Sequence, residues 1–159
     1  MRILIVSDTH GMHRNFTKVL ERVGKIDMLL HMGDVEGGEY FIEQNAGCEV
    51  HIVEGNNDWF SELPTEEVLQ IGKYKVLMTH GDRYYVSMDT RRLKEAARSK
   101  GVQIAMYGHT HRPDLDIEED LIVLNPGSLS YPRQAGRRGS YILMEIDEYG
   151  EASFDINYV

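Results

Sequence analysis

Cysteine is nearly absent from this sequence, which has only Cys48 in 159 residues. A single thiol excludes an internal disulfide and any metal site built from several cysteines, and it favours a reducing compartment. Long apolar runs are absent too, since none approaches the roughly 20 residues that cross a bilayer. The apolar run at residues 3–6 is far too short for a signal peptide, so we expect a cytoplasmic protein with no membrane partner.

Basic residues are also scarce, with 17 Lys and Arg against 26 Asp and Glu and a formal net charge of −9. This charge opposes binding to a phosphate backbone, so we expect no long nucleic acid as a partner. Bound divalent cations would offset part of the charge locally and allow a small phosphate ester to approach. The length and the 42% hydrophobic content predict one globular domain over residues 1–159. Small acidic enzymes often self-associate, so a homo-oligomer stays open, with no segment assigned to it.

In the first half of the chain, apolar runs are followed by polar segments that contain glycine. Residues 3–6 predict a strand buried on both faces, and residues 16–23 predict a helix with one apolar stripe that ends near Gly24. Further strands are predicted at residues 28–30 and 50–53. Strand, polar loop and helix is therefore the predicted repeating unit.

The second half begins with a predicted β-hairpin, at residues 68–71 and 76–78. Asp89 can cap a helix that Gly101 would end, and residues 104–107 predict another buried strand. The remaining apolar runs, at residues 121–124, 141–144 and 152–156, predict antiparallel sheet. This order of elements indicates an α/β fold in which two mixed β-sheets stack face to face with helices outside.

Side chains of the metal-ligand type directly follow five of the predicted strands. The segments are Asp8-Thr9-His10, Gly33-Asp34, Gly55-Asn56-Asn57-Asp58, His80-Gly81-Asp82 and Gly108-His109-Thr110-His111. Ligands bind beyond the carboxyl ends of strands in α/β sheets, so we expect these segments to converge. Carboxylate, imidazole and amide ligands without thiolate suit Mn²⁺, Fe or Zn²⁺. The set is too large for one catalytic ion, which predicts two cations that share a bridging carboxylate.

The ordered motifs D-x-H, G-D, G-N-x-D, H-G-D and G-H-T-H, between Asp8 and about Ser130, resemble the calcineurin-like metallophosphoesterase superfamily. They are most similar to its small bacterial and archaeal phosphodiesterase group. The resemblance implies a four-layer α/β/β/α sandwich and two divalent cations per chain, with Mn²⁺ first and Fe, Zn²⁺ or Ni²⁺ as alternatives. It implies that one cation is held by Asp8, His10 and His111, the other by Asn56, His80 and His109, and both by Asp34.

The same resemblance implies hydrolysis of a small phosphodiester, with a metal-bound hydroxide attacking phosphorus in line. It assigns catalytic importance to three positions, Asp34, Asn57 and Asp58. Asp58 would act by orienting a ligand or a nearby group. Asn57 stands where many related phosphatases have a histidine that assists the leaving oxygen. An amide cannot deliver a proton at neutral pH, so general-acid help worth about 10²- to 10⁴-fold is missing unless another group supplies it.

Two other functions stay open: a phosphomonoesterase, and a non-catalytic scaffold module, because the fold also resembles a retromer subunit. Several residues near the motifs are predicted to be structural, namely His13, His31, His51 and the turn Asn125-Pro126-Gly127-Ser128. Asp82 either orients His80 or forms a turn with Gly81. For Arg133, Arg137 and Arg138 we favour a solvated loop over contact with an anionic substrate.

Overall fold

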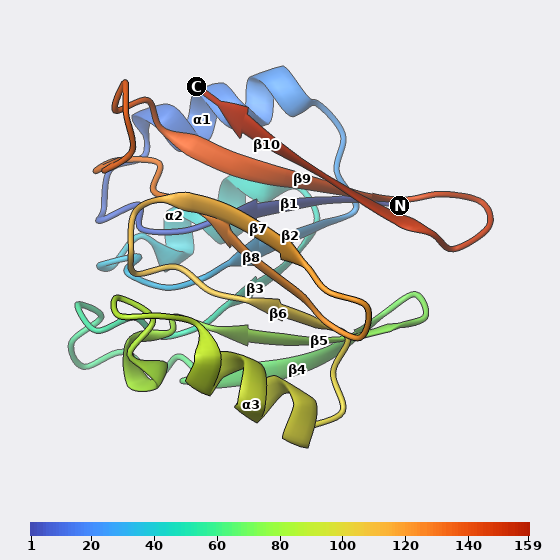
Figure 1. The fold of residues 1–159 in the computed structure, drawn as a ribbon. Helices are drawn as coiled ribbons and strands as arrows, with labels where there is room; N and C mark the ends of the chain where they lie inside the picture. The colour runs from blue at the N-terminus through green and yellow to red at the C-terminus, as the bar shows by residue number, and fades with distance from the viewer.

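The computed structural model describes residues 1–159, as ten strands and three α-helices (Figure 1). The strands are β1 (Arg2–Val6), β2 (Met28–His31), β3 (Glu49–Ile52), β4 (Glu66–Ile71), β5 (Tyr74–Thr79), β6 (Ile104–Met106), β7 (Pro113–Ile117), β8 (Ile122–Pro126), β9 (Ser140–Ile146) and β10 (Ala152–Tyr158). The helices are α1 (Arg14–Val23), α2 (Glu39–Ala46) and α3 (Arg91–Ser99), with a short 3-10 turn at Asp82–Tyr84. No helix combines the length and the apolar character needed to cross a membrane.

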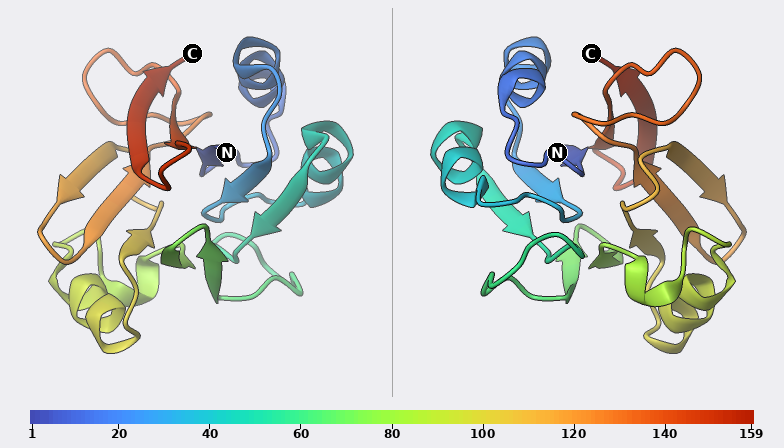
Figure 2. Two further views of the ribbon diagram at one scale, coloured as in Figure 1. Left: turned by 90° about the vertical axis from the view of Figure 1, so that its right-hand side faces the viewer. Right: turned by 90° about the vertical axis from the view of Figure 1, so that its left-hand side faces the viewer.

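The strands form two five-stranded sheets, in the orders β10-β9-β1-β2-β3 and β4-β5-β6-β8-β7. In each sheet three neighbouring strands are parallel, β1-β2-β3 in one and β5-β6-β8 in the other. The other pairings, of β9 with β1 and β10 and of β4 and β7 with their neighbours, are antiparallel. Helices α1 and α2 lie outside the first sheet and α3 lies outside the second (Figure 2). The predicted four-layer sandwich with two mixed sheets is therefore confirmed.

Alternate residues of each central strand enter different cores, which explains their continuous apolar sequences. In β1, Ile3 and Ile5 pack between the two sheets, whereas Leu4 and Val6 pack beneath α1 and α2. In β5, Met78 faces the other sheet and Leu77 faces α3. Because both faces are covered, every position must be apolar to avoid burying unpaired polar groups.

Two sequence-based expectations about the elements are wrong. No helix follows β3, because residues 53–65 hold the polar segment Gly55–Asp58 and then Pro64 without any helical apolar period. The expectation of antiparallel sheet for the C-terminal runs is wrong for one side of β8, which pairs parallel with β6 in the second sheet; β9 and β10 do pair antiparallel, in the first sheet. Strand β7, which pairs with β8, was not predicted; its short Pro113–Ile117 stretch starts with proline and lies at a sheet edge, where the apolar pattern is weak.

Candidate metal centre

The ligand-type side chains meet at one end of the sandwich, beyond the carboxyl ends of β1, β2, β3, β5 and β6. Short backbone hydrogen bonds tie their loops together across the sheet ends. The N–H of Asp8 donates to the carbonyl of Gly33 at 3.0 Å, and the N–H of Gly108 donates to the carbonyl of His80 at 3.0 Å. Parallel neighbours align the loops within each sheet, and the stacking of the two sheets brings together residues such as His10 and His111, which are 101 positions apart in sequence.

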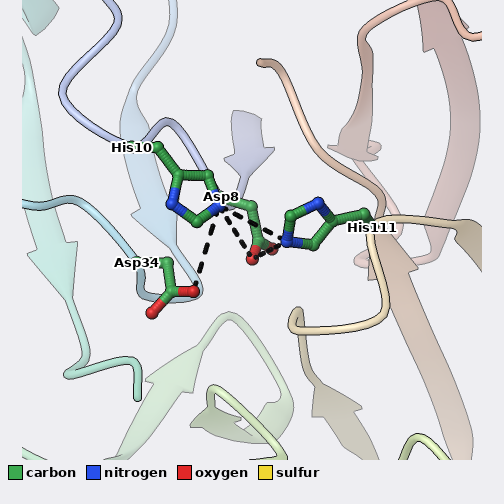
Figure 3. Close-up of side chains that lie close together, drawn as sticks. All are labelled: Asp8, His10, Asp34 and His111. Carbon is green, nitrogen blue, oxygen red and sulfur yellow. Dashed lines mark hydrogen bonds and ion pairs between the residues drawn. The ribbon is translucent and has the colours of Figure 1, made fainter. Parts of the chain in front are cut away.

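Four of these side chains form a compact cluster: Asp8, His10, Asp34 and His111. One nitrogen or carboxylate oxygen from each lies within 4.8 Å of the others, and they point toward one another from the three loops that follow β1, β2 and β6 (Figure 3). His111 Nε2 is 3.0 Å from Asp8 Oδ1 and 3.3 Å from His10 Nε2. Asp8, Asp34 and His111 are buried, and His10 is partly exposed.

The cluster contains hydrogen-bond acceptors that lack a donor. His111 Nδ1 donates to the carbonyl of Tyr131 at 2.7 Å, and His10 Nδ1 donates to the Glu36 carboxylate at 2.7 Å. In the neutral rings this leaves the lone pairs on the two Nε2 atoms, which face each other. Asp8 Oδ1 is buried and has no hydrogen-bond partner. An arrangement of inward-facing lone pairs fits a cation at their centre.

A second group of ligand-type side chains adjoins the first through Asp34. His80 Nε2 lies 3.1 Å from Asn56 Oδ1 and 3.5 Å from Asp34 Oδ2, and its Nδ1 donates to the carbonyl of Met32. The ring of His109 lies against that of His80, with centroids 5.1 Å apart. Asp34 Oδ2 is also 3.9 Å from His10 Nε2, so one carboxylate oxygen faces both groups. The structure therefore brings all seven predicted ligands together.

The electrostatics of the cluster favour positive charge at its centre. Burial opposes protonation of His80, but a hydrogen bond to Asp34 and the charges of Asp8 and Asp34 raise its pKa to about 9. Burial raises the pKa of Asp34, yet the hydrogen bonds from His80 and Asn57 outweigh it and hold that pKa well below its usual range. Asp34 therefore stays ionised at neutral pH and attracts a proton or a metal ion.

Backbone strain is concentrated at the ligands. Asp8, His10, Asp34, His109 and His111 have φ between 47° and 65°, in the left-handed region that residues with a side chain seldom adopt. Two glycines permit the close packing of these loops: a Cβ on Gly55 would stand 2.2 Å from Asp34 Oδ1, and one on Gly108 would stand 2.1 Å from Ser7 Oγ. Strain of this kind persists only where the surroundings impose it, as at binding sites.

The other two candidate catalytic residues lie beside Asp34. Asn57 donates to both Asp34 oxygens, from its backbone N–H at 2.8 Å and from its amide Nδ2 at 2.7 Å. Asp58 accepts the backbone N–H groups of Gly55 at 2.8 Å and Glu36 at 2.7 Å. It thereby ties the loop after β3 to the loop after β2, a positioning role for the loops that carry Asn56 and Asp34.

The remaining histidines lie outside the cluster, as predicted. Burial lowers the pKa of His31 to about 4, so it stays neutral, accepts the N–H of Gly33 and donates to Thr9. His13 stacks on Phe41, and His51 pairs with Glu49 and Glu67.

Asp82 does not contact the nitrogens of His80, since His80 Nδ1 donates to Met32; the turn interpretation of Asp82 is correct. The turn predicted at residues 125–128 begins inside β8, which ends at Pro126, and this segment packs near the site. Asn125 donates to the carbonyl of Gly108, and Ser128 donates to the carbonyl of Asp8.

Glu36 and the Tyr131 carbonyl were missed by sequence reasoning, although they orient two ligand histidines. Glu36 lies two residues after Asp34, and Tyr131 follows the turn at 125–128, but only the folded chain places them beside His10 and His111. A backbone carbonyl carries no residue-type signal that a motif could reveal.

A family model for the calcineurin-like phosphoesterase superfamily domain matches residues 1–149. The chain belongs to this superfamily. A probable metallophosphoesterase of Methanocaldococcus jannaschii is 35% identical over 136 residues, which cover 84% of this chain and 70% of that protein. Members of the superfamily are metal-dependent hydrolases, and the cluster around Asp34 is the part of this chain that fits a metal.

Solved structures show the same calcineurin-like fold. A predicted phosphoesterase from Streptococcus pneumoniae has a TM-score of 0.83 and 31% identity, covering 99% of this chain and 88% of that one. Vps29 of Entamoeba histolytica, solved in complex with zinc, has a TM-score of 0.79 and 27% identity, with 99% of both chains covered.

Proposed function

We propose that this chain is a phosphodiesterase that hydrolyses small phosphodiesters with two divalent cations. Asp8, His10 and His111 hold one cation, Asn56, His80 and His109 hold the other, and Asp34 contacts both. When bound, the cations activate a water molecule and neutralise charge on the phosphate oxygens. Mn²⁺ is the first metal to test, because the ligands include carboxylate, imidazole and amide but no thiolate; Fe, Zn²⁺ and Ni²⁺ are the alternatives.

The observation that carries metal binding is the set of inward-facing acceptors. His10 and His111 each donate Nδ1–H to an oxygen, so the Nε2 atoms of the neutral rings and the buried Asp8 Oδ1 face the centre of the cluster without a donor. In a buried site that binds no cation, each of these acceptors would be expected to receive a hydrogen bond from a protein donor.

The choice of a diester rests on the shape of the surface beside the ligands. One hollow of about 520 Å³ is lined in part by Thr110, which lies between His109 and His111. Another, of about 630 Å³, is lined in part by Asn57, which follows the ligand Asn56. Two hollows adjoining one ligand cluster leave room for two substituents on phosphorus, whereas a monoester has only one.

The protein's own groups set which leaving groups depart easily. Asn57 uses its amide to hold Asp34, and an amide supplies no proton at neutral pH. We therefore expect diesters of acidic phenols to react much faster than diesters of alkyl alcohols.

The deciding experiment compares the p-nitrophenyl diester and monoester after metal removal and reconstitution with Mn²⁺. We expect a higher kcat/KM for the diester and no hydrolysis of either ester in excess chelator. A higher kcat/KM for the monoester would instead support a phosphomonoesterase.

A scaffold role is the second candidate, because the fold matches Vps29 along the whole chain. Against it, all seven ligand positions are filled here by residues able to bind a metal. The scaffold candidate would be favoured if the protein bound metal but hydrolysed no ester with any of the four metals.

A further inference from the structure

The hollow beside His111 holds two arginines, Arg112 and Arg133. It has a volume of about 520 Å³, and its other polar lining residues are Ser87, Tyr107, Thr110 and Asp114. Arg112 directly follows the ligand His111, and the backbone N–H of Arg133 donates to the carbonyl of His111 at 2.9 Å. The backbones of the two arginines are therefore held next to the first ligand group, and their side chains are exposed.

Neither guanidinium group has a partner within the protein. Arg112 and Arg133 make hydrogen bonds only through their backbone groups, and no carboxylate oxygen lies within 4.0 Å of either guanidinium. Asp114 lines the same hollow, but its carboxylate accepts the hydroxyl of Tyr107 at 3.3 Å. By contrast, Arg2 and Arg98 pair with carboxylates on the same molecule.

Arg14 and Arg137 also have no carboxylate oxygen within 4.0 Å of their guanidinium groups, but Arg112 and Arg133 differ from them in lining the same hollow. Two such groups in one hollow repel each other unless an anion lies between them. The planar fork of a guanidinium matches the oxygens of a phosphate, which it can bind with two parallel hydrogen bonds.

The hollow lined by Asn57 and Asp58, which follow the ligand Asn56, has the opposite charge. Its lining includes Glu36, Glu39 and Asp58 and no arginine or lysine, together with the exposed rings of Trp59 and Phe60. An anionic substituent would be repelled there, whereas an uncharged aromatic group would not. The two hollows therefore distinguish the two substituents of a diester by charge.

We propose that Arg112 and Arg133 form a subsite for a second phosphate group, carried by one substituent of the diester substrate. This inference rests on the proposed phosphodiesterase function for the orientation of the substrate. The reacting phosphate lies at the cations, the second phosphate binds the two arginines, and the leaving group faces Trp59 and Phe60. The preferred substrates are thus diesters with an additional phosphate, not simple dialkyl phosphates.

The test compares the p-nitrophenyl ester of thymidine 5′-phosphate with the same compound phosphorylated on its 3′ oxygen, both with Mn²⁺. We expect the wild type to show a kcat/KM about 10- to 100-fold higher for the 3′-phosphorylated ester, mainly through a lower KM, as charge-assisted hydrogen bonds provide. The Arg112→Ala/Arg133→Ala variant should lose most of this preference. The Arg112→Lys/Arg133→Lys variant should retain part of it, because it keeps the charge but not the fork.

Arg137→Ala is the matched control, because Arg137 is exposed in the same loop as Arg133 but does not line the hollow. It should keep the full preference for the 3′-phosphorylated ester. The subsite is ruled out if the wild type shows no preference, or if the double alanine variant keeps it.

Binding without turnover separates this inference from the proposed function. Calorimetry should show that the wild type binds thymidine 3′,5′-bisphosphate more tightly than thymidine 5′-phosphate. The double alanine variant should bind the two compounds with equal affinity. If that difference appears but no diester is hydrolysed, the subsite stands and the phosphodiesterase assignment fails. If simple aryl diesters are hydrolysed but the difference is absent, the assignment stands and the subsite fails.

Discussion

Asp34 is the residue on which both ligand groups depend. Its Oδ2 atom faces His10 on one side and His80 on the other, at 3.9 Å and 3.5 Å. Asn57 donates to both of its oxygens, which restricts the carboxylate to one orientation. A negative charge held in this way can keep two like-charged ions close together, which a neutral side chain of the same shape cannot do.

We therefore expect Asp34→Asn to lower kcat/KM for an aryl diester by at least about 100-fold, because it weakens both the metal pair and the field on the attacking water. Metal content and initial rates measured on the same preparation test this. Asp155→Asn is the control, since Asp155 is exposed on β10, away from the ligands. Two bound metals with near-normal turnover in Asp34→Asn would show that the bridging assignment is wrong.

Asn57 determines a second property of the site, its tolerance of poor leaving groups. In Asn57→His, an imidazole with a pKa of about 6.5 could protonate a departing alkoxide. The difference in kcat/KM between aryl and alkyl diesters should therefore become smaller. The ratio of kcat/KM for the two diesters, measured across pH, reports this. The number of bound metals should not change, because the proposed ligand Asn56 is intact and the backbone N–H of residue 57 still donates to Asp34. An unchanged ratio with both metals present would mean that another group already supplies the proton.

The carboxyl ends of the parallel strands are the elements that assemble the site. Strands β1, β2, β3, β5 and β6 each supply a ligand just where the chain leaves the sheet, and five of the seven ligands take left-handed backbone conformations there. Glycine at Gly33, Gly55 and Gly108 allows neighbouring loops to approach within distances that a Cβ would prevent. The position of each ligand thus depends on how closely its loop packs against the neighbouring loops.

Gly55→Ala tests this dependence, because the new Cβ would stand 2.2 Å from both the backbone nitrogen and Oδ1 of Asp34. The loop after β2 must then shift, so we expect metal affinity to fall about 10- to 100-fold, as for other changes beside metal ligands. Metal titration by calorimetry measures the loss, and circular dichroism confirms that the protein is folded.

Gly101→Ala is the control, since it has positive φ but no atom within 4 Å of the added Cβ. It should lower stability by about 1 kcal/mol through strain and leave metal affinity unchanged. Equal metal affinity in Gly55→Ala and the wild type would contradict the role given to Gly55.

On the scale of the whole molecule, a net charge of −9 and a cluster of inward-facing acceptors both disfavour the metal-free state. Cations that bind only the folded protein stabilise it, by about 2.7 kcal/mol for one site at a free concentration of about 100 times the Kd. For a chain of this size that corresponds to a rise in Tm of about 5–10 °C.

We expect Mn²⁺ to raise Tm by this amount. Excess chelator should reverse the rise in Tm and abolish hydrolysis. Elemental analysis at saturation should find two ions per chain, because the ligand set is too large for one. One ion per chain at saturation with full activity would exclude the two-metal proposal. Mg²⁺ added at the same ionic strength provides the control for unspecific screening of the negative charge.

Much of the fold was predictable because it depends on local pattern. Runs such as residues 3–6 and 104–107 are apolar at every position, which only strands covered on both faces require. The ligand types were predictable for a similar reason, since Asp8, Asp34 and His80 each follow such a run directly. A buried strand followed by a polar loop with glycine identifies both the element and the end at which a ligand can bind.

Tertiary structure alone decided which strands pair and what surrounds the ligands. The sequence of β8 does not indicate which of the two sheets the strand joins. Strand β7 is a polar edge strand that pairs only with β8. Glu36 and the Tyr131 carbonyl orient ligand histidines that lie 26 and 20 positions away in sequence. Arg112 and Arg133 likewise share a hollow only because the chain returns to His111 after β8. Sequence patterns report short-range periodicity and residue type, whereas these contacts arise from packing between distant segments, which no short window of sequence contains.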